Sequence, residues 1–214
     1  MCFIDSDDFV HKDYVQFLYE ALIKYDADIA ICKFLYYTGR EDISLKSKDI
    51  ETLGNREENM RLINRNLNYI VVWNKLYKAT LFNNLRFIPN KVHEDEFIIH
   101  HIFWKAEKSV ISENILYYYR QATNSITNSP FNDSKLQNII EAFDDRISFY
   151  KKNKIDDLKI VFNKKWNIII HKGVKSRSNY ARKYILNHII EFFTKFQFPV
   201  KKKIKLYFKL LFNR

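Results

Sequence analysis

Hydrophobic and polar positions follow two different periods along residues 1–130. Short apolar or alternating stretches predict β-strands at 1–4, 28–34, 69–73, 110–111 and 115–120. Apolar residues at helical spacing predict helices between them, over 14–25, 55–65 and 93–106, with a short helical turn at 80–84. The polar stretch 38–53 is predicted to be a loop. Strands that alternate with helices favour an α/β fold for this part of the chain.

From residue 131 onward the pattern is helical throughout. Apolar positions three or four residues apart predict helices over 134–152, 156–170, 177–196 and 200–212. Residues 151–214 contain 18 lysine and arginine residues but 3 acidic ones, a net charge of +15. Residues 1–150 therefore carry −4 of the total charge of +11. We expect a basic, all-helical region over 131–214 whose partner is a polyanion or an anionic membrane surface.

Composition excludes several kinds of site. The chain has 3 glycines, and it contains neither a P-loop nor a G-x-G-x-x-G dinucleotide turn. Cys2 and Cys32 are too few for a disulfide framework or a zinc centre, and we interpret them as buried apolar residues in a reduced compartment. No apolar run approaches the roughly 18 residues of a membrane span, and no signal peptide is visible. We therefore expect a cytoplasmic protein.

Three carboxylates, those of Asp5, Asp7 and Asp8, directly follow the apolar stretch 1–4. Side chains two residues apart in an extended segment project to the same side, so Asp5 and Asp7 can reach one ion. Oxygen ligands of this kind suit a hard divalent cation, and ligands of open α/β sheets bind beyond the carboxyl ends of the strands. A solvated turn before the next helix explains the same residues without a metal.

A second acidic group, Glu94, Asp95 and Glu96, stands where the helix over 93–106 is predicted to begin. The helix dipole favours acidic side chains at an N-terminus, so their position does not by itself require a catalytic role. The sequence is not the zinc-binding H-E-x-x-H motif, because residue 97 is Phe. Both a structural and a catalytic interpretation of these acids therefore stay open.

Five short motifs, in this order, resemble those of family-2 glycosyltransferases with the GT-A fold. They are F-I-D-S-D-D-F (3–9), A-D-I-A-I-C-K-F (27–34), W-N-K-L-Y-K (73–78), H-E-D-E-F (93–97) and Y-Y-Y-R-Q-A-T-N-S-I (117–126). Each motif is short, and their shared order and spacing indicate the family. The resemblance covers residues 1–130, about 60% of the chain, and is nearest to bacterial capsule and exopolysaccharide enzymes.

The resemblance implies a metal-dependent, inverting transfer of a sugar from a nucleotide-sugar donor, expected to be a UDP-sugar. Asp5 and Asp7 would match the D-x-D motif that holds Mn²⁺ or Mg²⁺ against the donor diphosphate. Asp95 would match the general base that takes the proton of the acceptor hydroxyl, and Glu94 would support it. The acceptor would be a growing surface polysaccharide or a polyprenyl-linked saccharide. No nucleic-acid partner is expected, since no recognition motif is present.

The same resemblance gives further residues roles in binding. Arg120 and Ser125 would lie in the segment that closes over the diphosphate, and a guanidinium suits phosphate oxygens. Asp8 and Trp73 would contact the substrate, with Trp73 as a stacking wall for a sugar ring. A tryptophan packed in the core is the alternative interpretation of Trp73.

The motifs with which these enzymes begin are absent from the printed residues. Family members open with a strand, a V-x-N-type turn and a D-D-G-S motif that bind the nucleoside. The resemblance therefore predicts the C-terminal half of a GT-A domain, with an unpaired apolar sheet edge beside residues 1–4. It also predicts weak or no binding of UDP-sugar by this chain alone. A truncated enzyme and a catalytically inactive fragment both fit this pattern.

The predicted helix over 200–212 is basic and amphipathic. Its apolar positions share one face: Val200, Ile204, Tyr207, Phe208 and Leu211. Lysines occupy the opposite side, at 201, 202, 205 and 209, and Lys203 interrupts the apolar sector. This pattern is typical of a helix at an anionic membrane surface, which would place the protein peripherally at the inner face of the cell membrane. A helix packed on the core with a solvated lysine face is the alternative.

Overall fold

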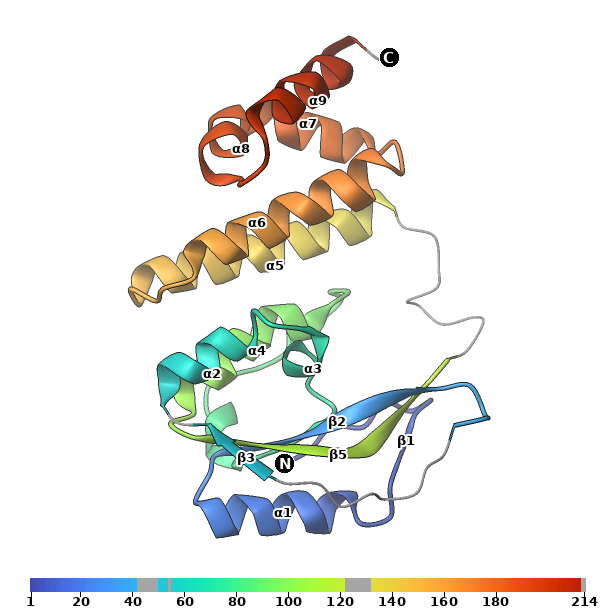
Figure 1. Ribbon diagram of the computed structural model, residues 1–214, viewed down its shortest axis with the longest axis vertical. Helices are drawn as coiled ribbons and strands as arrows, with labels where there is room; N and C mark the ends of the chain where they lie inside the picture. Colours follow the sequence, from blue (N-terminus) through green and yellow to red (C-terminus); the bar gives the residue numbers. More distant parts are fainter. Residues whose placement is uncertain (42–49, 54, 122–131, 213–214) are drawn as a thin grey trace. The chain divides into compact units, whose positions relative to one another are not determined.

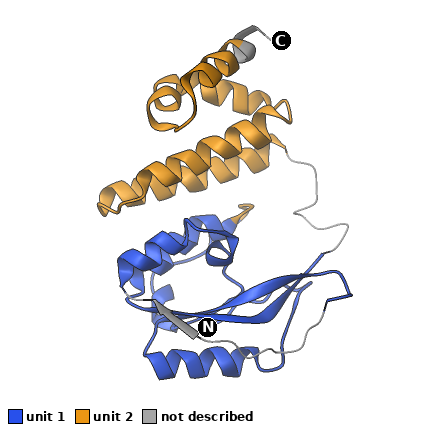
Figure 2. Cartoon of the chain, in the orientation of Figure 1, with its two compact units in different colours: residues 1–89, 94–129 blue, residues 90–93, 130–214 orange. Residues whose placement is uncertain are grey.

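The computed structural model describes residues 1–41, 50–53, 55–121 and 132–212. The chain divides into two compact units, each of which is treated separately (Figure 2). Unit 1 comprises Met1–Pro89 and Glu94–Ser129, and unit 2 comprises Asn90–His93 and Pro130–Arg214. Unit 1 mixes strands and helices, whereas the regular structure described in unit 2 is helical.

Unit 1 contains a mixed sheet with helices on both faces. Its strands are β1 (Phe9–Val10), β2 (Ile29–Tyr37), β3 (Ile50–Leu53), β4 (Lys75–Tyr77) and β5 (Ser109–Arg120). Its α-helices are α1 (Tyr14–Tyr25), α2 (Arg56–Leu62), α3 (Leu67–Ile70) and α4 (Glu94–Lys105), with a 3₁₀ turn at Ala79–Phe82. Helix α1 covers one face of the sheet, and α2 and α4 lie over the other (Figure 1).

The strand order is β1-β5-β2-β4, and β3 also pairs with β5. The central pair, β2 and β5, is parallel, and the other pairs are antiparallel. The chain start continues the sheet beyond β4, where Cys2 forms a bridge with Leu76 and the Tyr77 N–H donates to the Met1 carbonyl over 2.9 Å. This pairing brings residues 5–8 past the end of the sheet and toward β5.

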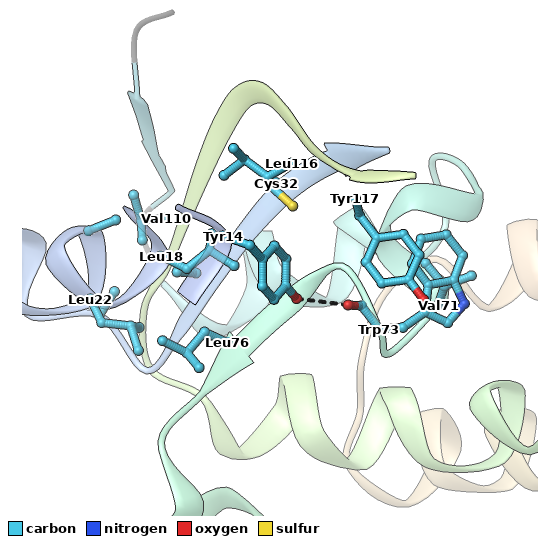
Figure 3. Close-up of a cluster of buried hydrophobic side chains, with 13 residues drawn as sticks. Tyr14, Leu18, Leu22, Cys32, Val71, Trp73, Leu76, Val110, Leu116 and Tyr117 are labelled. Atoms are coloured by element: carbon cyan, nitrogen blue, oxygen red, sulfur yellow. Dashed lines mark hydrogen bonds between the residues drawn. The ribbon is translucent and has the colours of Figure 1, made fainter. Parts of the chain in front are cut away.

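A cluster of buried side chains fixes α1 against the sheet (Figure 3). Tyr14 and Leu18 of α1 are fully buried, and the Tyr14 hydroxyl donates to the Trp73 carbonyl over 2.8 Å. Cys32 lies in the same cluster and is buried, as predicted, whereas Cys2, also predicted to be buried, is only partly buried. Because the buried Tyr14 hydroxyl has a hydrogen-bond partner, burial of the Tyr14 ring adds apolar contact without leaving a polar group unpaired.

Most predicted elements of unit 1 are present, and four predictions were wrong. Residues 50–53, predicted to be the end of a loop, form strand β3, which pairs with β5. Residues 1–4 form an isolated bridge rather than a strand. The segment 69–73 was predicted as a strand but includes the end of α3, because Asn66 caps a helical turn there by accepting from the Asn68 N–H over 3.0 Å. The predicted strands at 110–111 and 115–120 are one strand, β5. Between the two predicted segments, the N–H of the buried Asn114 donates to the Ser112 hydroxyl over 3.0 Å, within strand β5.

Unit 2 is built from five α-helices within its described residues. They are α5 (Asp133–Lys152), α6 (Leu158–Ile168), α7 (Asn179–Asn187), α8 (Ile189–Lys195) and α9 (Val200–Phe212), with a π-helical segment at Ile169–Val174. The helix predicted over 177–196 is therefore divided at His188. In the part of the chain that the structure describes, no helix is both long and apolar enough to cross a membrane.

A buried lysine and a buried tryptophan organise unit 2. Lys165 is 1% exposed and pairs with Asp144 over 2.9 Å and with Glu191 over 2.5 Å. These two pairs join α6 to α5 and α8, and they offset the cost of removing the ammonium group from water. The neighbouring Trp166 is fully buried and packs against the ring of Phe192, with ring centroids 5.2 Å apart.

Gly173 allows the π-helical segment to approach α5 and α7. A methyl group at this position would lie 2.6 Å from the Ala181 Cβ and 2.8 Å from a methyl carbon of Leu136. Real Cβ atoms do not approach neighbours this closely, so the helices would have to move apart. A side chain at residue 173 is therefore incompatible with the packing of unit 2.

We predict that Gly173→Ala lowers the free energy of unfolding by about 1–3 kcal/mol, the usual cost of an extra methyl group in a packed core. Urea unfolding measures the loss, and hydrogen exchange of α6 and α7 locates it in unit 2. Lys175→Ala, at an exposed neighbouring position, is the control and should leave stability nearly unchanged. Equal stability of Gly173→Ala and wild type would contradict this description of the packing.

Candidate active site

The fold brings together two acidic segments that are far apart in the sequence. Asp5, Asp7 and Asp8 lie in the turn before β1, and Glu94 and Asp95 open α4. The segments are close enough for their charges to interact, because the Glu94 carboxylate raises the pKa of Asp5 and the Asp5 carboxylate raises that of Asp95. The two acidic segments therefore lie near enough in unit 1 for their charges to act on one another.

Asp5 sits in the most crowded negative environment of this group. Its side chain reaches solvent, yet surrounding protein removes part of its hydration, and this desolvation is the main reason why its pKa rises to about 6. The charges of Asp8, Asp7 and Glu94 add to the rise. Carboxylate oxygens are the donors that hard divalent cations prefer, and a cation here would relieve the repulsion. The acidic turn therefore offers oxygen donors of the kind that a divalent cation takes.

Asp8 ties the acidic turn to β5. One of its carboxylate oxygens accepts from the Tyr117 hydroxyl over 2.8 Å, and the other accepts from the Arg120 N–H over 2.8 Å. The Tyr117 hydroxyl in turn accepts from the Asp5 N–H over 3.1 Å. Both oxygens of Asp8 accept hydrogen bonds from β5. Asp8 therefore anchors the turn that carries Asp5 and Asp7.

Asp95 lies deeper in the protein than the other acids of the site. One carboxylate oxygen accepts from the Val72 N–H. The buried Oδ1 makes no hydrogen bond within the described residues. Burial is the main cause that raises the pKa of Asp95 to about 7; Glu94 raises it further and Lys75 opposes the rise. A carboxylate of this kind, with an uncommitted oxygen and a pKa near neutrality, is suited to accept a proton.

Lys75 is a site residue that the sequence reasoning missed. Its ammonium group is fully buried and donates to the Asn68 carbonyl over 2.7 Å, to the Asn74 Oδ1 over 2.6 Å and to the Val71 carbonyl. A signal was present in the sequence, because the lysine of W-N-K-L-Y lies within two residues of Trp73, Leu76 and Tyr77, which are side chains of a kind that a core buries.

Trp73 is packed inside the core of unit 1, and Figure 3 shows it beside Tyr117. It is 6% exposed. Its ring stacks on Tyr117, with centroids 4.2 Å apart, and on Tyr119, with centroids 5.6 Å apart. This geometry favours the core interpretation over a stacking wall, and the role in sugar binding stays a prediction.

Arg120 stands at the end of β5 with an exposed side chain. Its guanidinium lies over the Phe9 ring, 5.5 Å from the centroid, while its backbone N–H binds Asp8. The group is therefore near the acidic turn and accessible to an anionic ligand. Ser125, predicted to act beside it, lies outside the described residues.

Comparison with known proteins agrees with the motifs. Residues 1–86 match the family model described as Glycosyl transferase family 2. Glycosyltransferase GlyA of Streptococcus pneumoniae serotype 4 is 29% identical over 157 residues, which are 68% of this chain and 22% of that protein. Glycosyltransferase GlyG of the same organism is 29% identical over 155 residues, which are 68% of this chain and 51% of that protein. The chain thus spans about half or less of the length of these relatives.

A solved structure shows the same fold. The crystal structure of S. aureus TarS residues 1–349 in complex with UDP-GlcNAc has a TM-score of 0.54 and 14% identity, and the match covers 98% of this chain and 55% of that one. The mixed α/β, GT-A fold predicted from the sequence is thereby confirmed. Together with the match to the family model, these similarities support the interpretation of the chain as part of a glycosyltransferase.

We predict that Tyr117→Phe loosens the acidic turn, because it removes the hydroxyl that binds both Asp8 and the Asp5 N–H. The free energy of unfolding should fall by about 1–2 kcal/mol, the cost of leaving a partly buried polar group without its partner. Urea unfolding measures the change. Tyr36→Phe, which alters a half-exposed tyrosine on β2, is the matched control. The described role of Tyr117 is wrong if its variant is as stable as the control.

Proposed function

We propose that the protein transfers a sugar from a nucleotide-sugar donor, a UDP-sugar, to a surface polysaccharide or a polyprenyl-linked saccharide, with inversion at the anomeric carbon. One observation carries the proposal. Asp5 of the D-x-D motif and Asp95 lie ninety residues apart in the sequence, and the Asp5 charge nevertheless raises the pKa of Asp95, together with burial and the Glu94 charge. Perturbed carboxylates grouped in this way are a mark of functional sites.

Asp5 and Asp7, both exposed in the turn before β1, would hold the divalent cation, Mn²⁺ or Mg²⁺. When bound, the cation neutralises negative charge on the departing diphosphate. Asp8 contributes by fixing the turn through Tyr117 and the Arg120 N–H. The exposed Arg120 guanidinium can pair with phosphate oxygens of the donor, and Ser125 is proposed to act with it.

Asp95 would act as the general base. Its carboxylate accepts the proton of the acceptor hydroxyl while the hydroxyl oxygen bonds to the anomeric carbon and the bond from that carbon to the donor diphosphate breaks. Attack opposite the leaving group inverts the anomeric configuration. Glu94, one residue earlier, adds negative charge that raises the proton affinity of Asp95. Glu94 thus supports the base without taking the proton itself.

The choice of donor rests on the family match and on the fold. TarS, which shares the fold, was crystallised with UDP-GlcNAc, and this supports a nucleotide sugar for the present site. The relatives GlyA and GlyG are named as glycosyltransferases without a sugar or an acceptor in their names. We therefore propose the class of donor and the class of acceptor and leave the sugar to a donor panel.

We predict that Asp95→Asn lowers the rate of sugar transfer by roughly 10²- to 10⁴-fold, the usual contribution of a positioned general base. The assay measures UDP released and sugar transferred, with a panel of UDP-sugars at high concentration because weak donor binding is expected. Mn²⁺ is present, and chelation should abolish the reaction. Asp26→Asn, at an exposed position near Asp28, is the matched control and should keep full activity. Transfer by Asp95→Asn at the wild-type rate would contradict the proposal.

We also propose that α9 attaches the protein to anionic lipid at the inner face of the cell membrane. Three apolar side chains form an exposed row along this helix: Val200, Ile204 and Phe208 are 61%, 43% and 52% exposed. Exposed lysines at 201, 202 and 205 flank the row. Apolar side chains beside lysines suit an interface of acyl chains and anionic headgroups.

The structure corrects the predicted faces of this helix. Lys203, expected to interrupt the apolar sector, is 3% exposed and donates to the Phe193 carbonyl over 2.9 Å. Tyr207, expected on the apolar face with Val200, packs its ring against Phe193, with centroids 6.2 Å apart. Helix α9 therefore packs on α8 through Lys203 and Tyr207, which leaves the row at 200, 204 and 208 open.

We predict that replacing Val200, Ile204 and Phe208 with serine abolishes co-sedimentation with vesicles that contain phosphatidylglycerol. The wild type should bind these vesicles, bind neutral vesicles weakly and lose binding as salt rises. A chain that ends at Phe198 should behave as the triple variant does. The matched control replaces Val15, Tyr19 and Ile23, an exposed row of the same spacing on α1, and should bind as the wild type does. Equal binding of wild type and the α9 variant would refute membrane attachment through α9.

A further inference from the structure

The buried ammonium group of Lys75 is the least expected feature of unit 1. It is fully buried, yet it forms no ion pair within the described part of unit 1. Its three contacts are oxygens of Asn68, Val71 and Asn74, all from the turn that leads into β4. A buried charge is costly unless it is hydrogen-bonded, so these contacts must persist while Lys75 is charged.

The same turn carries the hydrogen-bond donor that Asp95 uses. Val72, whose N–H binds the Asp95 carboxylate, follows Val71 directly. Asn74 closes the turn from the other side, where its Nδ2 donates to the Cys32 carbonyl over 2.6 Å and to the Asn68 Oδ1 over 2.8 Å. Lys75 therefore holds in place the stretch of backbone that orients Asp95.

Lys75 and Asp95 also interact through charge. Burial lowers the pKa of Lys75, and the Asp95 carboxylate opposes this shift more than Cys32 does. In return, Lys75 lowers the pKa of Asp95 against the effects of burial, Glu94 and Asp5. Burial and, after it, the Asp95 charge raise the pKa of the buried Tyr77 hydroxyl. Among these groups Lys75 is the one that favours the ionised form of Asp95.

We propose that Lys75 is a positioning residue of the site, whose ammonium group holds the 68–74 turn against Asp95 and supplies the positive charge that keeps this carboxylate ready to accept a proton. The inference rests on the proposed function, in which Asp95 is the base. Lys75 touches neither donor nor acceptor in this scheme. It acts through the Val72 N–H and through its charge, and Asp95 remains the group that takes the proton.

The decisive experiment follows the ionisation of Asp95 directly, by carbon NMR of its labelled carboxyl group as the pH is varied. In Lys75→Met the midpoint of this ionisation should rise by about one pH unit or more, because an opposite charge nearby lowers a carboxyl pKa by this amount. Lys75→Arg, which keeps the charge, should shift it less. Lys33→Met removes a half-exposed lysine of β2 that pairs with Glu113 and should leave the midpoint unchanged. An unchanged midpoint in folded Lys75→Met would overturn the proposal.

A second measurement needs no variant, which matters because Lys75→Met can fail to fold. Nitrogen NMR of the Lys75 side chain in the wild type distinguishes an ammonium group from a neutral amine. Because burial lowers the pKa of Lys75 to about 7, we expect the ammonium form up to neutral pH, where Asp95 begins to ionise, and a neutral amine well below neutral pH would contradict the proposal. Both readings are independent of turnover, so they decide on Lys75 even if the sugar-transfer assay fails. Where transfer is measurable, the acid limb of its pH profile should move to higher pH in Lys75→Met and return in Lys75→Arg.

Discussion

The burial of the Lys75 ammonium group constrains the 68–74 turn of unit 1. A charge removed from water requires strong hydrogen bonds, and Lys75 finds them in the carbonyls of Asn68 and Val71 and in the Asn74 side chain. The 68–74 turn must therefore close around it. The closed turn places the Val72 N–H where it binds Asp95, and it leads directly into β4. The stability of the fold and the geometry of the site therefore depend on the same contacts.

The acidic turn is held from the opposite side of the site by a second set of contacts. Tyr117 and the Arg120 N–H bind Asp8, and the Tyr117 hydroxyl also accepts from the Asp5 backbone. The site thus gathers like charges that repel one another, and rigid neighbours on β5 and in the 68–74 turn keep them together. Repulsion of this kind is tolerated where function requires it, and it is why a cation and a proton are natural ligands of the group.

The sequence predicted those parts of the structure that local pattern determines. Helix α1 begins and ends where predicted, and α4 lies within one residue of the prediction at each end. The resemblance to the glycosyltransferase family, rather than local pattern, joined the acids at 5–8 and 94–95 in one candidate site. Tertiary contacts decided the rest. The apolar residues of 69–73 suit a strand or a buried turn, and hydrogen bonds to Asn66 and Lys75 select the turn. Likewise, only the packing of α8 shows that Lys203 is buried, because periodicity alone places lysines in solvent.

The central claim is that the acidic turn and the start of α4 form one cation-dependent site. Mn²⁺ broadens the NMR signals of nuclei close to it, so a titration of the isotopically labelled protein with Mn²⁺ tests the claim directly. The amide signals of residues 5–8 should broaden early together with those of 94–95, and they should recover on addition of excess Mg²⁺. Broadening confined to other acidic surface positions, such as Glu57, or broadening of one segment without the other, would contradict it.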